Sequence, residues 1–126
     1  MENKNIKASF FKSIKSQNNT ITTLELVLKD IKNGKWKNEI EQIRLAKATN
    51  RDEVYSKLKI NLHCFTPSAI FKDKRDKNLV LIYSGIMSID YDGLLMEEVD
   101  EIKNIIISNP NTYGCFISPS GNGLKV

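Results

Sequence analysis

The periodicity of apolar residues changes near residue 60, and this change constrains the fold more than any other feature of the chain. Before it, apolar residues recur at helical spacing and predict helices over residues 22–34 and 36–48, with a short third helix after Asn50. After it, the stretches NLHCFTPSAIF and NLVLIYSGIMSIDYD are rich in β-branched and aromatic residues and predict strands. A helical pattern, LMEEVDEIKNIIISNP, separates them from two later strands, TYGCFIS and GLKV. This order predicts a sheet domain of the α/β or α+β class preceded by N-terminal helices.

Signals at the ends of the first predicted helix support its placement. Thr22 and Glu25 have the spacing of a capping box, and Gly34 suits the C-terminal cap. The Lys-, Asn- and Ser-rich segment before this helix contains Phe10 and Phe11. We therefore expect that segment to be an arm or a strand that docks on the domain.

The length of the chain leaves room for one domain. Its 126 residues predict a single unit over 1–126, with a helical lead-in at about 1–60 and a sheet at about 61–126. A hydrophobic fraction of 40% and a charged fraction of 27% are typical of a folded domain. Because the sequence has no signal-peptide pattern and no run of about 18 apolar residues, we expect a cytoplasmic protein without a membrane partner. The chain ends at Val126 inside a predicted strand, so we expect a fragment of a longer protein.

Charge and cysteine content narrow the possible partners and metals only slightly. A net charge of +4 permits a phosphate-bearing partner without requiring one. Cys64, Cys115 and His63 are too few for a four-ligand structural zinc site. We expect His63 to be a half-buried strand residue without a catalytic role.

The stretch SGIMSIDYDGL, residues 84–94, ends a predicted strand on two aspartates separated by one residue. Residues two apart in a strand share a face, so Asp90 and Asp92 project together with Cα atoms about 6.6 Å apart, while Met87 and Ile89 face the core. Paired carboxylates at a strand end suit Mg²⁺ or Mn²⁺ and the transfer of phosphoryl or nucleotidyl groups. An exposed turn at Asp92-Gly93 accounts for the same residues, and a DxD motif also occurs in glycosyltransferases.

The stretch SPSGNGLKV, residues 118–126, has the composition of a phosphate-binding loop. Gly121 and Gly123 allow close approach of the backbone to a ligand, Ser118 and Ser120 supply hydroxyl groups, and Lys125 supplies a positive charge. The loop is not a Walker A motif, because no Gly-Lys-Ser/Thr ending opens a helix. A hairpin connection followed by an ordinary exposed lysine is the alternative. Since the aspartates, a helix and this loop follow one another, we expect them to meet in one cleft.

Several stretches together resemble the VirE N-terminal-like domain, a bacterial branch of the archaeo-eukaryotic primase-polymerase superfamily found on mobile elements and plasmids. They are FTPSAIF, RDKNLVLIYSGIMSIDYDGL and CFISPSGNGLKV, with the lead-in TLELVLKDIKNGKWKNEIEQIR and YSKLKINLHCFTPS. The resemblance covers roughly the whole chain and is densest in its second half. It implies an RRM-like core sheet in which Asp90 and Asp92 are the catalytic ligands of Mg²⁺ or Mn²⁺.

The resemblance also implies a set of nucleotide-binding residues: Ser118, Ser120, Gly121, Gly123, Lys125 and Arg75. Arg75 belongs to the basic stretch FKDKRDKN, where the interleaved Asp73 and Asp76 favour an ordinary solvated loop. The chain departs from the superfamily in two ways. Its second motif carries Lys125 where active primases typically have histidine, and the third metal-binding acid would lie beyond Val126.

These observations lead us to expect a primase-polymerase-like nucleotidyltransferase domain of a mobile-element or plasmid replication protein. Its partners would be a nucleoside triphosphate and a DNA or RNA template-primer, with a helicase-type domain in the same parent chain. Without the third acid, we expect activity of the parent protein rather than of this fragment. A non-catalytic nucleic-acid- or nucleotide-binding module is the first alternative, and a DxD glycosyltransferase fragment is the second.

Overall fold

The computed structural model describes residues 5–126 as a mixture of helices and short antiparallel strands. The elements are β1 (Lys7–Phe11), β2 (Thr20–Thr23), α1 (Leu24–Lys32), α2 (Lys37–Ala48), α3 (Asp52–Asn61), β3 (Cys64–Thr66), β4 (Ala69–Phe71), the 3-10 turn η1 (Lys77–Leu79), β5 (Val80–Tyr83), β6 (Asp90–Tyr91), α4 (Met96–Ile107), β7 (Phe116–Ile117) and β8 (Leu124–Lys125). The predicted α+β class is confirmed.

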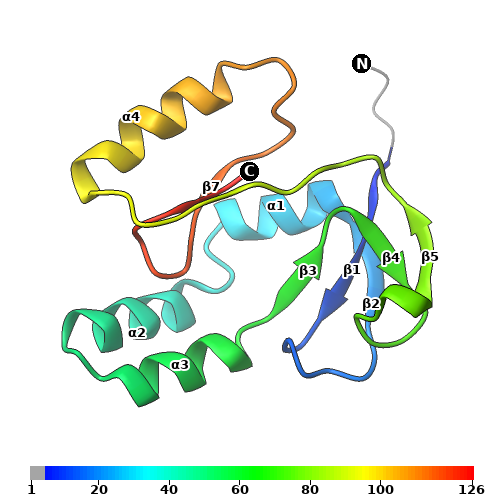
Figure 1. Cartoon of the computed structure of the whole chain (residues 1–126), viewed down its shortest axis with the longest axis horizontal. Helices are drawn as coiled ribbons and strands as arrows, with labels where there is room; N and C mark the ends of the chain where they lie inside the picture. Colours follow the sequence, from blue (N-terminus) through cyan, green and yellow to red (C-terminus); the bar gives the residue numbers. More distant parts are fainter. Residues whose placement is uncertain (1–4) are drawn as a thin grey trace.

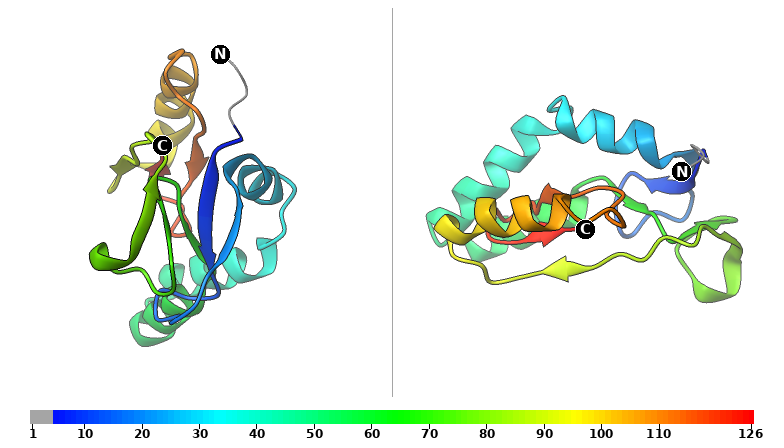
Figure 2. Two further views of the ribbon diagram at one scale, coloured as in Figure 1. Left: turned by 90° about the vertical axis from the view of Figure 1, so that its right-hand side faces the viewer. Right: turned by 90° about the horizontal axis from the view of Figure 1, so that it is seen from above.

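The strands form three small sheets, with the orders β2-β1-β3, β4-β5 and β6-β8-β7. Every strand pair within them is antiparallel. The helices α2, α3 and α4 gather at one end of the molecule, and the β4-β5 hairpin lies at the other (Figure 1). Seen from above, α1 and α2 lie on one side of the strands, and the connection from β5 to β6 runs along the opposite side (Figure 2). The RRM-like arrangement stays a prediction.

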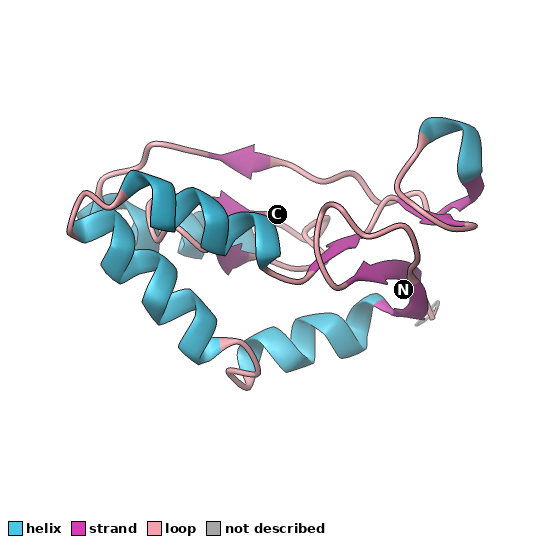
Figure 3. Ribbon diagram, turned by 90° about the horizontal axis from the view of Figure 1, so that it is seen from below, coloured by secondary structure: helices cyan, strands magenta, loops and turns pink. Residues whose placement is uncertain are grey.

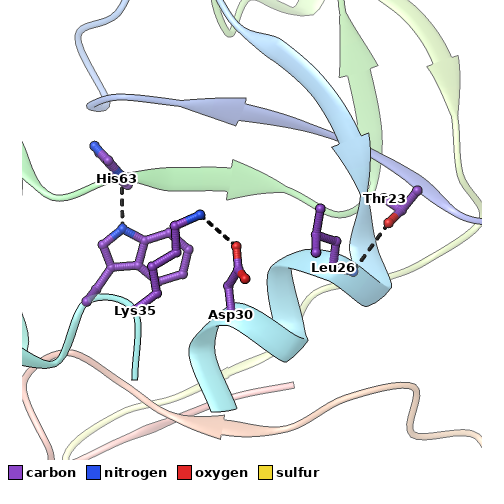
Figure 4. Close-up of polar contacts among 6 residues, drawn as sticks. Thr23, Leu26, Asp30, Lys35 and His63 are labelled. Carbon is purple, nitrogen blue, oxygen red and sulfur yellow. Dashed lines mark hydrogen bonds and ion pairs between the residues drawn. The ribbon is translucent and has the colours of Figure 1, made fainter. Parts of the chain in front are cut away.

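The predicted helices are present, but their caps differ from the sequence pattern. Thr23 caps α1, because its Oγ1 accepts a hydrogen bond of 3.3 Å from the backbone N–H of Leu26 (Figure 4). Thr22, the expected cap, instead pairs with Ala8 in the β1-β2 ladder. The chain passes directly from β2 into α1, so strand pairing decides where the helix can begin.

A buried apolar cluster joins the first sheet to the β4-β5 hairpin. Phe11 and Phe71 pack edge to face with ring centroids 6.4 Å apart, and Ala69 completes the cluster. The buried hydroxyl of Ser9 accepts a hydrogen bond of 2.9 Å from the backbone N–H of Phe71. Phe11 therefore lies in a docked strand, which was one of the two predicted forms of the N-terminal segment.

The expectation that Met87 and Ile89 face the core is wrong. Met87 is 74% exposed and Ile89 is 40% exposed. The connection between β5 and β6 is mostly loop, and β6 itself is only two residues long (Figure 3). Strand alternation assigns residues to a face, but a face is buried only where a second layer packs on it.

Among residues 5–126, no helix combines the length and the apolar character that a membrane span requires.

Candidate functional site

The sheet β6-β8-β7 places the first predicted aspartate beside the predicted phosphate-binding lysine. In the β6-β8 ladder Asp90 lies opposite Lys125 and Tyr91 lies opposite Leu124. Two hydrogen bonds between the backbones of Ile89 and Val126, of 2.8 and 2.9 Å, extend this pairing. Opposed residues on antiparallel strands point to the same face, so the side chains of Asp90 and Lys125 meet. Lys125 Nζ lies 2.8 Å from Asp90 Oδ2, and both side chains remain partly exposed.

The Ser/Gly stretch is the connection between β7 and β8, as the hairpin alternative proposed. The backbone N–H of Ser118 donates to the carbonyl of Gly123 at 2.9 Å, and the N–H of Gly121 donates to the carbonyl of Ser118 at 2.9 Å. Gly121 has a φ of +85°, a conformation that glycine adopts without strain. Ser118 is buried, and its Oγ lies 3.0 Å from the Oγ of Ser120, which donates to Asn122 Oδ1 at 2.7 Å. We call residues 118–123 the Ser/Gly loop.

The second aspartate lies against this loop. A Cβ atom added to Gly123 would lie 3.3 Å from Asp92 Oδ1 and 3.1 Å from Ser118 Oγ. The backbone N–H of Leu94 donates to the carbonyl of Asn122 at 2.8 Å, which fastens the chain after Asp92 to the loop. The bend itself uses Gly93 at a φ of +68°. The Asp92-Gly93 turn is therefore present, and it carries the carboxylate to the Ser/Gly loop.

Sequence reasoning missed Arg44, a residue of α2 that holds the loop from the other side. Its Nη2 donates to the carbonyl of Ser118 at 3.2 Å, and its Nε donates to the carbonyl of Pro119 at 3.3 Å. A Cβ atom at Gly121 would lie 3.3 Å from Arg44 Nε, so the loop passes close to the guanidinium group. No local signal could identify Arg44, because its partner Ser118 is 74 residues away along the chain.

Arg75 lies elsewhere, on the exposed connection between β4 and β5. Its positive charge acts on Cys64: burial raises the pKa of that thiol, and Arg75 opposes the rise. Within the described part of the chain, no hydrogen bond or ion pair links Arg75 to the sheet β6-β8-β7 or to the Ser/Gly loop. The structure thus brings together the other predicted site residues without Arg75.

The expectation that His63 is a half-buried strand residue is wrong, because the residue is exposed and lies between α3 and β3. It belongs to an aromatic cluster. Its Nδ1 accepts a hydrogen bond of 2.9 Å from Trp36 Nε1 (Figure 4), and the ring of Phe10 lies 5.8 Å from that of Trp36 and 5.4 Å from that of His63. Through these contacts the His63 ring packs against Phe10 of β1 and Trp36 at the start of α2.

The oxygen atoms around the two aspartates suit a hard cation that keeps other ligands. Mg²⁺ is commonly held by one or two carboxylates together with water and substrate phosphates. Asp90 and Asp92 supply two such carboxylates, and the hydroxyl groups of Ser118 and Ser120 lie on the Asp92 side. Over residues 5–126, no group of three His, Cys, Asp or Glu side chains is placed to hold a metal. A cation held by these two carboxylates would need further ligands from water or from a phosphate-bearing molecule.

One comparison with known proteins gives a match. Residues 57–126, more than half of the chain, match the family described as BT4734-like, N-terminal domain. The matched range contains both aspartates, the Ser/Gly loop and Lys125, whereas Arg44 precedes it. No curated protein and no solved structure matches the chain.

Gly123 allows the Ser/Gly loop and β6 to approach each other, and this can be tested by substitution. In Gly123→Ala the new Cβ would lie 2.5 Å from the backbone oxygen of Tyr91. We expect a loss of about 1–3 kcal/mol in the free energy of unfolding, because the two strands must separate. Urea unfolding followed by Trp36 fluorescence measures this loss.

Gly114→Ala is the matched control for Gly123→Ala. There the new Cβ would lie 2.7 Å from Leu28 Cδ1, the end of a flexible side chain that can move aside. We expect a smaller loss of stability than in Gly123→Ala. An equal or larger loss in Gly114→Ala would contradict the close approach of β6 to the loop.

Proposed function

We propose that this chain, which belongs to the family of BT4734-like N-terminal domains, binds a nucleoside triphosphate together with a divalent cation. One observation carries the proposal: the carboxylate of Asp92, which follows β6, lies next to a buried serine and a glycine of the Ser/Gly loop. Asp92 Oδ1 and Ser118 Oγ both lie within 3.3 Å of the position that a side chain on Gly123 would take. Glycine at position 123 lets these groups approach one another, because a side chain there would meet the backbone oxygen of Tyr91.

In this proposal Asp90 and Asp92 hold Mg²⁺ or Mn²⁺. The cation would supply neutralising charge to the phosphates. The backbone of the Ser/Gly loop and the hydroxyl group of Ser120 orient the triphosphate, and Arg44 adds a positive charge behind the loop. Lys125, now paired with Asp90, would move to a phosphate oxygen when the cation takes its place. A partly exposed ion pair contributes only about 0–1 kcal/mol, so this exchange costs little.

The reaction proposed for such a site is primase-polymerase-like nucleotidyl transfer on a DNA or RNA template-primer. It would take place within a longer cytoplasmic replication protein of a mobile element or plasmid that also carries a helicase-type domain. Support for this part comes from the sequence resemblance of both motifs. The positions of Asp90, Asp92 and the Ser/Gly loop are compatible with it.

A non-catalytic binding module remains the second candidate function. The ion pair between Asp90 and Lys125 favours it, because the ammonium group already neutralises one of the two carboxylates. In that case nucleic acid binds without a cation, and no cation-dependent binding of a nucleoside triphosphate is observed.

Calorimetry with a nucleoside triphosphate and Mn²⁺ tests the proposed site. We expect the wild-type chain to bind the triphosphate only when Mn²⁺ is present. In Asp90→Asn/Asp92→Asn the affinity should fall at least about tenfold, which corresponds to about 1.4 kcal/mol. Asp100→Asn/Glu101→Gln removes two exposed carboxylates of α4 and should bind like the wild type. Equal binding by both double variants would refute the site.

Lys125→Met tests the two roles proposed for this lysine, which are to occupy Asp90 in the absence of the cation and to contact a phosphate oxygen in its presence. Binding of Mn²⁺ alone should become tighter by up to about fivefold, because the competing ammonium group is gone. Binding of the triphosphate with Mn²⁺ should weaken about tenfold, since a charge-assisted contact to phosphate is lost. Lys57→Met, at an exposed position of α3, is the control and should change neither affinity. Changes of the same sign in both affinities would exclude the proposed exchange.

A further inference from the structure

Two loops far apart in the sequence form one basic surface. The first follows β1 and spans residues 12–19, and the second follows β4 and spans residues 72–79. We define the two-loop surface by their cationic residues, all of which are exposed: Lys12, Lys15, Lys72, Lys74, Arg75 and Lys77.

Side-chain hydrogen bonds hold the two loops together. Asn19 Nδ2, in the first loop, donates to the carbonyl of Phe71 at 3.0 Å and also to the carbonyl of Asp73. The bond between Ser9 and Phe71 fixes the strands from which the loops emerge. The two loops lie next to each other at the lower right of Figure 1. The cationic side chains are thus displayed by a supported pair of loops.

The charge of this surface is largely uncompensated. The first loop contains no acidic residue, and the second contains Asp73 and Asp76. The carboxylate of Asp76 accepts a hydrogen bond of 2.9 Å from the backbone N–H of Asn78, where it caps η1. Throughout residues 5–126, none of the six cationic side chains takes part in an ion pair. Six positive charges against two negative ones give a surplus equal to the formal net charge of the whole chain, +4.

We propose that the two-loop surface binds the phosphodiester backbone of a nucleic-acid strand. Phosphate contacts in such complexes come from lysine and arginine together with serine, asparagine and glutamine side chains. Ser13, Gln17, Asn18 and Asn78 supply these polar groups between the cations. Only one large apolar side chain of the first loop, Ile14, is among the exposed hydrophobic residues, whereas a membrane-binding loop would present several.

This surface is separate from the proposed nucleotide site. Its residues come from the β1-β2 and β4-β5 connections, and those of the nucleotide site come from β6, β8 and the Ser/Gly loop. Strand binding therefore needs neither a cation nor the two aspartates. Asp90→Asn/Asp92→Asn should bind strands as the wild type does, so either proposal can fail alone.

Fluorescence anisotropy with labelled oligo(dT) and oligo(U) strands tests the inference. The variant Lys72→Gln/Lys74→Gln/Arg75→Gln/Lys77→Gln should lose at least about tenfold in affinity at low salt. The slope of log affinity against log salt should fall by about 0.7 for each cation that contacted a phosphate. Lys12→Gln/Lys15→Gln should produce a smaller change of the same kind. Equal binding of the two strands, which differ in the sugar and in the methyl group of the base, assigns recognition to the phosphodiester backbone.

The control removes the same number of charges elsewhere. Lys29→Gln/Lys32→Gln/Lys37→Gln/Lys57→Gln changes four exposed lysines of α1, α2 and α3 and should alter affinity by less than about threefold, with a correspondingly small change in salt slope. Trp36 fluorescence verifies that each variant is folded. An equal loss in the control would show that general charge drives binding and would overturn the inference. Absence of strand binding by the wild type, or binding only to anionic lipid vesicles, would also overturn it.

Discussion

Antiparallel pairing of β6 with β8 is the constraint on which the candidate site depends. It sets Asp90 opposite Lys125, and it brings the chain that carries Asp92 alongside the Ser/Gly loop. A shift of one residue in this register would turn every side chain of one strand to the other face. Gly123 makes the approach possible, since any side chain there would meet the backbone oxygen of Tyr91.

The positive groups of the chain differ in whether a carboxylate neutralises their charge. Lys125 neutralises Asp90 directly, whereas Arg44 donates to carbonyl oxygens and so keeps its charge uncompensated behind the loop. The cations of the two-loop surface are exposed and unpaired within the described residues. This division suits the two proposals, in which a triphosphate binds near Lys125 and Arg44 and a polyanionic strand binds the two-loop surface.

The sequence predicted those parts of the site that depend on local pattern. The Ser/Gly hairpin and the turn at Asp92-Gly93 follow from residue types that favour them, and their order along the chain predicted that they would meet. Arg44 could not be predicted, because its contact with Ser118 depends on how α2 packs. The ion pair of Asp90 required the strand register, which short strands do not reveal. Met87 and Ile89 were misplaced because alternation does not show whether another layer covers a face.

The central claim is that the two aspartates and the Ser/Gly loop form one cation-dependent site. Paramagnetic broadening of backbone amide signals by bound Mn²⁺ tests it most directly, because the effect falls steeply with distance from the ion. We expect low Mn²⁺ concentrations to broaden the signals of Asp90–Asp92 and of residues 118–123 together, and to leave those of the β4-β5 connection sharp. Broadening of the aspartate signals without those of the loop, or broadening centred on other acidic residues, would contradict the claim.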